Sequence, residues 1–262
     1  MTSLFLLTIW LLTRLSFIRY DQRLRNRLLL ILVLIPIILA PALALGVTSV
    51  LWSILAATAL IFSEKVIPER LLVPGRIMGF ALVVLATWLM PLPELSSWSV
   101  LVIDWLGLTT EQMTIGLWWL LGFLLVAGEA NLLIRLLFHS FDLEPMSKTP
   151  ELTETEAPEA IELTITASQN AEPEIDQREY NAGRIIGILE RWLMYIVLVG
   201  SQQQGAASGS QYSIIAVILA AKGFARFRQL EERAFAEYVL IGTLASTLLT
   251  VAVSLLISSR LA

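Results

Sequence analysis

The chain has 262 residues, of which 56% are hydrophobic and only 15% are charged, with a mean hydropathy of +0.75. A soluble domain usually carries about 25% charged residues, so this composition excludes an ordinary soluble domain and predicts a protein that places apolar surface in a lipid bilayer. With no cysteine and a single histidine, His139, the chain can form no disulfide, no cysteine-ligated cluster and no multi-histidine metal site within one copy.

The first apolar run, Thr2–Ile18, contains Arg14 and is followed at once by a basic cluster, Arg19–Arg27. It has no basic region before it and no small-residue cleavage site after it, so it is predicted to be a short span or an interfacial anchor. The next run, Leu28–Ser63, is uncharged and would be about 54 Å long as one helix, against a hydrocarbon core of about 30 Å. It is therefore predicted to fold back as two helices, with the turn at Leu45–Ser49.

Two further spans are predicted in the N-terminal region, at Ile77–Leu92 and Met113–Ile134, and the charged segment Glu64–Arg76 is predicted to be a loop before them. Between the two spans lies Glu94–Gln112, which is acidic and has no basic residue. Its apolar, aromatic part, Trp98–Leu108, is too short to cross a bilayer. Tryptophan favours the headgroup level, so we expect this part to lie at the membrane interface.

Residues 141–182 differ from the rest of the chain. They hold half of its 22 acidic residues, and much of the remainder is Pro, Thr, Ser and Ala. Such a segment has little apolar surface to bury and repels itself, so it is predicted to be an acidic, disordered, cytoplasmic linker. It would separate an N-terminal membrane region, residues 1–140 with about five spans, from a C-terminal three-span module, residues 183–262.

The C-terminal module is predicted to contain spans at Gly183–Gly200, Tyr212–Phe227 and Tyr238–Ser258, with the uncharged loop Ser201–Gln211 between the first two. Because cytoplasmic loops gather Lys and Arg, an eight-span topology places all but two of the 18 basic residues in cytoplasmic loops or adjoining span ends. The exceptions are Arg14 and Arg260. The sequence thus predicts an all-α, polytopic helical membrane protein with about eight transmembrane helices, or seven if residues 2–18 lie on the membrane surface.

Three segments carry a family resemblance: Gly183–Arg191 (GRIIGILER), Ala220–Phe227 (AAKGFARF) and Ala236–Thr243 (AEYVLIGT). Together they resemble a C-terminal module of uncharacterised bacterial integral membrane proteins, and Gly122–Leu137 is similar to what precedes the module there. The relatives have a shorter loop at the position of Ser201–Gln211. The resemblance implies a multi-pass protein of the bacterial inner (plasma) membrane and implies no activity.

Ionisable residues near the predicted cytoplasmic span ends are the candidate site: Glu129, Arg184, Glu190, Arg191, Lys222, Arg226 and Glu237. A charge at membrane depth costs roughly 2.5–3.5 kcal/mol, so opposite charges are expected to pair, with Glu190 and Glu237 as counter-ions. The set could form a polar site for an anion, a lipid headgroup or a proton. It could instead be ion pairs that lock helix ends, or basic residues that reach lipid phosphates. The sequence favours the second interpretation because most of these charges lie within two turns of a span end.

The sequence contains no recognisable catalytic constellation and no phosphate-binding glycine loop. We therefore expect a non-enzymatic protein that scaffolds or regulates a membrane partner. A small-solute or ion transporter or channel that uses the inner-leaflet charges is the alternative, and a membrane enzyme with Glu129 or Glu190 as acid or base is the third. The expected partners are the bilayer and a membrane protein or a second copy, with no cofactor, metal or nucleic acid. Loss of Glu190, paired with Lys222 or Arg226, is predicted to have the largest effect.

Overall fold

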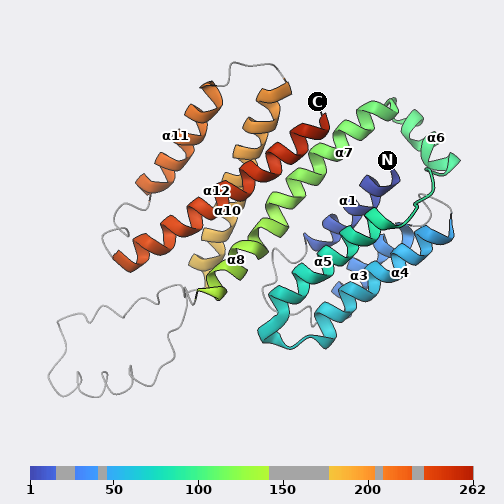
Figure 1. Ribbon diagram of the computed structural model, residues 1–262, viewed down its shortest axis with the longest axis horizontal. Coiled ribbons are helices and arrows are strands. Elements are labelled where there is room, and N and C mark those ends of the chain that lie inside the picture. The colour runs from blue at the N-terminus through green and yellow to red at the C-terminus, as the bar shows by residue number, and fades with distance from the viewer. Residues whose placement is uncertain (16–26, 41–45, 142–176, 204–208, 226–232, 262) are drawn as a thin grey trace.

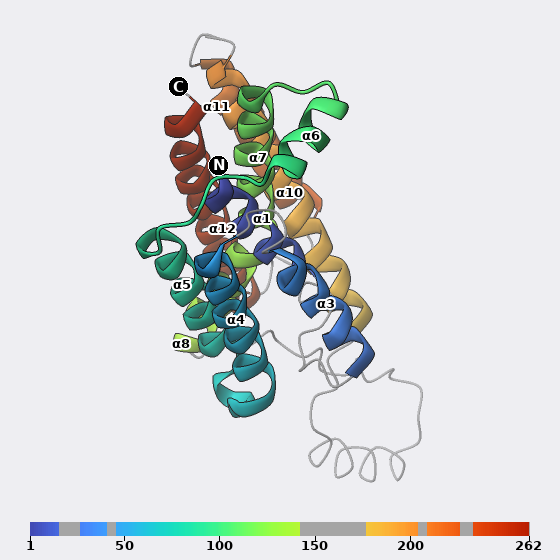
Figure 2. The same ribbon diagram turned by 90° about the vertical axis from the view of Figure 1, so that its right-hand side faces the viewer.

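The computed structural model describes residues 1–15, 27–40, 46–141, 177–203, 209–225 and 233–261, and these residues contain helices and no strand. The long helices lie side by side in one bundle, with a short helix, α6, across one end (Figures 1 and 2). The all-helical architecture that the sequence predicts is therefore confirmed for the described part of the chain.

Two helices that pack against each other occupy the stretch Leu28–Ser63, which confirms the predicted fold-back. The turn predicted at Leu45–Ser49 is wrong for Val47–Ser49, which already belong to the second helix, and Leu45 lies outside the described residues. The predicted loop Glu64–Arg76 is corrected as well: Glu64 continues the preceding helix in a π-helical turn, and Arg76 already lies inside the next helix. The elements are α1 (Thr2–Arg14), α3 (Arg27–Leu39), α4 (Val47–Ile61), the π turn η2 (Phe62–Val66), the 3-10 turn η3 (Glu69–Leu71) and α5 (Leu72–Leu89).

After α5 the chain forms α6 (Ser97–Trp105), which agrees with the short segment predicted at Trp98–Leu108. The following long helix is capped at Thr109, whose side chain accepts a hydrogen bond from the Gln112 backbone N–H, while the Gln112 side chain accepts one from the Thr109 N–H. This helix runs from Thr110 to Ser140 as α7 (Thr110–Leu124), the π turn η4 (Leu125–Glu129) and α8 (Ala130–Ser140).

Three helices make up the C-terminal module: α10 (Gln177–Gln203), α11 (Gly209–Ala225) and α12 (Arg233–Leu261). Helix α10 begins at Gln177, so its first six residues lie within the predicted range of the linker, 141–182. The rest of the predicted linker, residues 142–176, lies outside the described residues, as do residues 204–208 of the predicted loop Ser201–Gln211.

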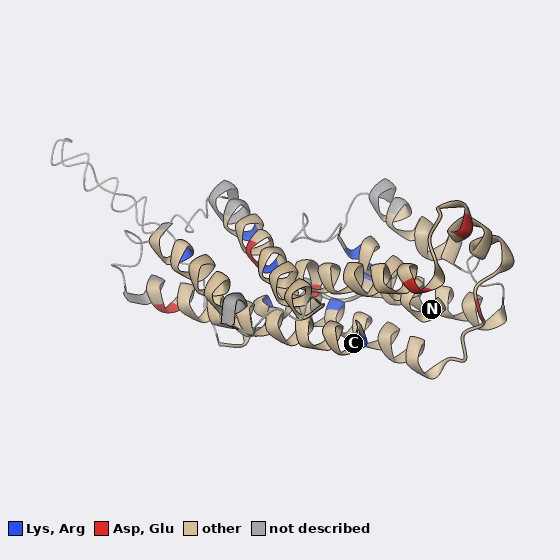
Figure 3. Cartoon of the chain, turned by 90° about the horizontal axis from the view of Figure 1, so that it is seen from above, with Lys and Arg blue, Asp and Glu red and all other residues tan. Residues whose placement is uncertain are grey.

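Five described helices are long and apolar enough to cross a membrane: Val47–Val66, Leu72–Leu89, Thr110–Ser140, Gly183–Gln202 and Ala236–Leu261. Two shorter apolar helices, Thr2–Arg14 and Ser213–Phe224, accompany them. Large apolar side chains face outward, and Trp88 and Phe224 are 81% and 85% exposed. Charged residues occupy few positions along the described helices (Figure 3). Such an exterior suits lipid as solvent, and the bundle is of the helical membrane-protein type.

The first helix lies inside the bundle. Leu6 and Trp10 of α1 are fully buried, and α1 packs against α3, α5 and α7. The same core contains Trp52 of α4, whose Nε1 donates a hydrogen bond to Thr87 Oγ1 of α5 at 2.7 Å. A helix on the membrane surface would keep one face toward water, so this position fits the predicted short span better than the predicted interfacial anchor.

Helices α7 and α10 are joined by aromatic side chains. Tyr195 is fully buried and its hydroxyl donates to the Trp119 carbonyl at 3.1 Å, while the Trp192 ring stacks on Phe123 with centroids 4.3 Å apart. Gly122 makes this approach possible, because a Cβ there would lie 2.2 Å from Tyr195 Oη and 2.6 Å from Cζ. The glycine is therefore required by packing at this helix crossing.

Gly122→Ala is expected to lower the free energy of unfolding by about 1–3 kcal/mol, because the new methyl group must displace a buried aromatic ring. Gly116→Ala, in the same helix but with no atom within 4 Å of its added Cβ, is the matched control and is expected to be neutral or slightly stabilising. Denaturant titration in mild detergent measures the free energy of unfolding of both variants. Equal stability of the two would show that α7 and α10 do not pack as described.

Candidate functional site

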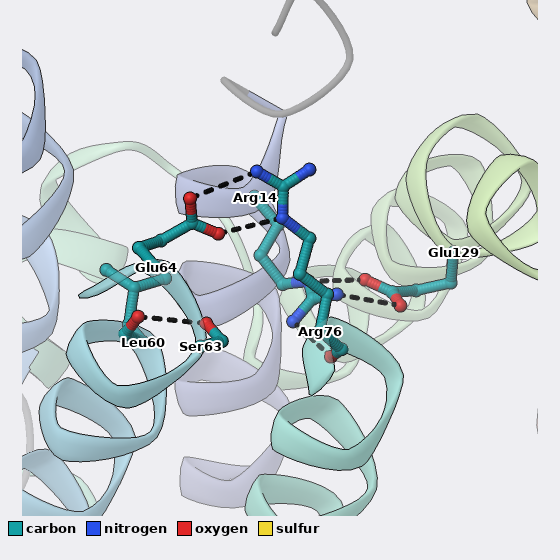
Figure 4. A network of polar contacts seen from close by, with 6 residues as sticks. All are labelled: Arg14, Leu60, Ser63, Glu64, Arg76 and Glu129. Carbon is teal, nitrogen blue, oxygen red and sulfur yellow. Dashed lines mark hydrogen bonds and ion pairs between the residues drawn. The ribbon is translucent and has the colours of Figure 1, made fainter. Parts of the chain in front are cut away.

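Four charged side chains from separate parts of the bundle meet inside it, and we call them the ionic cluster: Arg14, Glu64, Arg76 and Glu129. They come from α1, η2, α5 and η4, and none is more than 5% exposed. The two arginines lie between the two carboxylates, with Glu64 on one side and Glu129 on the other (Figure 4).

Each carboxylate in the ionic cluster is held by one arginine through both of its oxygens. Arg76 Nε donates to Glu64 Oε1 at 2.7 Å, and Nη2 donates to Oε2 at 3.1 Å. Arg14 Nε lies 2.6 Å from Glu129 Oε1, and its Nη2 donates to Oε2 at 3.2 Å. Arg14 Nη1 also donates to the Arg76 backbone carbonyl at 3.0 Å, which links the two pairs. The formal charges of the four side chains cancel.

The pairing explains how four charges can be buried in an apolar bundle. One charge at membrane depth costs roughly 2.5–3.5 kcal/mol, and a planar guanidinium that meets both carboxylate oxygens is the geometry that offsets such a cost best. The Arg14 guanidinium also lies 5.7 Å from the ring centroids of Trp10 and Phe80, which adds cation–π attraction. The ionic cluster therefore cross-links four segments of the chain at one level.

Both carboxylates of the ionic cluster lie on π-helical turns: Glu64 on η2 and Glu129 on η4. A π turn shifts the register of the backbone hydrogen bonds and is frequently found at functional sites. In η4 the carbonyl of Val126 accepts a hydrogen bond from Arg191 Nε of α10 at 2.7 Å. Two arginines, one from each half of the chain, therefore hold this turn.

The predicted site residues form three separate sets of contacts. Glu129 belongs to the ionic cluster, and its partner is Arg14. Glu190 forms an ion pair with Lys222, which confirms the first of the two partners predicted for it. Arg191 is buried, at 3% exposed, and contacts Val126 and Ser246.

Of the other predicted site residues, Arg184 is half-buried and Glu237 is exposed. Arg226 lies outside the described residues.

Sequence reasoning missed Arg14, Glu64 and Arg76 as site residues. Arg14 was expected to be an exception to the topology, and the other two were expected in a cytoplasmic loop. The signal was an arginine inside an apolar run, since such a charge needs a partner at the same depth. Its partner, Glu129, is 115 residues away in sequence. In the part of the chain that the structure describes, no group of three or more His, Asp or Glu side chains is arranged to hold a metal ion.

Comparison with known proteins found no matching family model, no matching curated protein and no matching solved structure. The fold and the site define the class: an all-helical protein with apolar helices of membrane length and a buried, charge-balanced ionic cluster.

Glu190→Gln is expected to lower the free energy of unfolding by up to about 1 kcal/mol. The Glu190 and Lys222 side chains remain 16% and 17% exposed, so water screens part of their attraction. Replacement of the more deeply buried Glu64 or Glu129 is expected to lower the free energy of unfolding by a larger amount. Glu190→Gln with Lys222→Met should recover wild-type stability, and the exposed Glu111→Gln is the control. A loss above about 3 kcal/mol would mean that the pair is buried in the membrane-bound protein.

Proposed function

We propose that this chain is a multi-pass protein of the bacterial inner membrane that scaffolds or regulates a membrane partner and has no catalytic role. The observation that carries the proposal is the ionic cluster, in which an arginine on another helix occupies both oxygens of each carboxylate. Such groups hold helices in place and offer no free carboxylate to a substrate. The bacterial location rests on the resemblance of the C-terminal module.

The proposed topology has eight spans, with Arg19–Arg27 in the cytoplasm and α1 as the first span. The central position of α1 supports this count, although a helix of 13 residues is only about 20 Å long. Reporter fusions at Thr48, Ser99, Glu156 and Gly205 test the topology, and only the fusion at Glu156 is expected to give a cytoplasmic signal. A cytoplasmic signal at Gly205 would contradict it.

Purification of the full chain from its native membrane in mild detergent tests the scaffold proposal. A membrane protein that co-purifies at fixed stoichiometry is the expected result, and a homo-oligomer of fixed size would identify a second copy as the partner. The Glu94→Gln variant, which changes an exposed side chain, is the control for nonspecific loss of the partner during purification. Recovery of a monomer alone, from membranes in which the chain is abundant, would contradict the proposal.

Transport is the second candidate function, and the two π turns favour it. Glutamates on irregular helical turns within apolar bundles recur where ions or protons cross membranes, since such turns can change register. Solute or proton flux into liposomes that contain this chain alone, lost in Glu129→Gln, would favour a transporter over a scaffold. Absence of flux across a panel of ions, protons and small solutes would leave the scaffold proposal as the better one.

A further inference from the structure

Arg191 is a buried cation without a carboxylate in contact. Its Nε donates to the Val126 carbonyl and its Nη1 donates to Ser246 Oγ at 3.2 Å, but its Nη2 is buried with no hydrogen-bond partner. Among the described residues no carboxylate contacts this guanidinium, because the adjacent Glu190 pairs with Lys222. An arginine in this state retains both a positive charge and donor capacity, which an anion could satisfy.

Three residues of α10 lie on one side of the helix, and we call them the arginine–glycine face: Arg184, Gly187 and Arg191. Spacings of three and four residues place them one above another. A Cβ added at Gly187 would meet a single neighbouring group, Arg191 Nη1 at 3.7 Å, so the space beside this glycine is open. Arg184 and Gly187 are both half-buried, so this end of the face is reachable from outside the bundle, and Arg191, at 3% exposed, lies at its inner end.

The depth of the face suits a phosphate group. The apolar part of α10 begins at Gly183, and Arg184 to Arg191 covers about 10 Å along the helix axis. This end is cytoplasmic in the proposed topology, and the cytoplasmic leaflet carries the anionic lipids. Guanidinium groups meet phosphate oxygens through paired N–H donors, and a glycine lets a headgroup approach the backbone.

We infer that the arginine–glycine face binds a phosphate group, carried either by an anionic lipid headgroup or by a phosphate-bearing solute. Arg191 Nη2, which has no hydrogen-bond partner in the described part of the bundle, and the guanidinium of Arg184 donate to the phosphate oxygens, and the missing side chain at Gly187 provides the room. This site is distinct from the ionic cluster, whose charges already cancel. It does not depend on whether the protein acts as a scaffold or a transporter.

Gly187→Leu is the decisive variant, because it fills the space and leaves both arginines in place. Gly116→Leu in α7 is the matched control, since no atom lies within 4 Å of its added Cβ and no arginine borders it. Arg191→Lys is the second variant: it keeps the charge and loses the paired donors. We expect Gly187→Leu, which blocks the space, and Arg191→Lys, which removes paired donors, each to weaken phosphate binding by at least about tenfold, an effect as large as the loss of one charge-assisted hydrogen bond.

The assay follows the thermal stability of the purified full chain during titration with three probes: short-chain phosphatidylglycerol, inorganic phosphate and short-chain diacylglycerol. Stabilisation by phosphatidylglycerol alone identifies a lipid headgroup, and stabilisation by inorganic phosphate as well identifies a phosphate group in solution. Either result supports the proposal if Gly187→Leu weakens the stabilisation by the phosphate probe and Gly116→Leu does not. Stabilisation by neither phosphate probe, equal stabilisation by diacylglycerol, or equal binding to the two leucine variants would overturn it.

Discussion

Glu64→Gln is expected to lower the free energy of unfolding by about 3–5 kcal/mol, because it leaves the Arg76 charge buried without a counter-ion. The two side chains are among the most completely buried in the described part of the chain, at 1% and 0% exposed. The Arg76 guanidinium points toward the Glu64 carboxylate (Figure 4), and no part of the residue is exposed to water in the described structure. The expected loss is therefore several times larger than for the partly exposed Glu190.

Denaturant titration in mild detergent measures the loss, with Glu94→Gln, an exposed acid between α5 and α6, as the control. The double variant Glu64→Gln, Arg76→Gln should recover more than half of it, because removing both charges costs less than removing one. If Glu64→Gln is as stable as Glu94→Gln, water or another group reaches Arg76, and the cluster is not a closed cross-link. If the double variant is no better than the single one, the interaction is not an ion pair.

Local composition was sufficient to predict most of the helices. The uncharged run Leu28–Ser63 exceeds a bilayer in length, and it forms α3 and α4. The aromatic segment Trp98–Leu108 is too short to cross, and it forms α6. These inferences succeed because the cost of transferring a segment into lipid depends mainly on its own residues.

Long-range pairing could not be predicted in the same way. Arg14 and Glu129 meet because α1 packs between α5 and the long α7–α8 helix, and nothing within either segment specifies that neighbour. The π turns η2 and η4 add one residue to a helical turn, which barely changes the apolar periodicity, so the sequence pattern does not indicate them. The pair Glu190–Lys222 was predictable because its two helices are consecutive and antiparallel.

Arg14→Gln is expected to lower the free energy of unfolding more than Glu129→Gln does, although the two residues form one ion pair. Arg14→Gln, with an expected loss of about 3–5 kcal/mol, leaves Glu129 buried and unpaired and also removes the hydrogen bond to the Arg76 carbonyl. Glu129→Gln leaves that hydrogen bond in place. A double-mutant cycle in mild detergent, with Glu94→Gln as the control, measures the difference.

The double variant Arg14→Gln, Glu129→Gln separates the two candidate functions, because it removes the charges and keeps the volumes. Its stability should lie between those of the single variants and the wild type, since the Arg76 carbonyl still lacks its donor. If the ionic cluster only positions helices, this variant keeps its partner at the wild-type stoichiometry. If Glu129 carries a proton or binds an ion, the folded double variant loses flux in liposomes. A variant that folds but loses its partner would place the cluster in the binding surface and contradict a purely structural role.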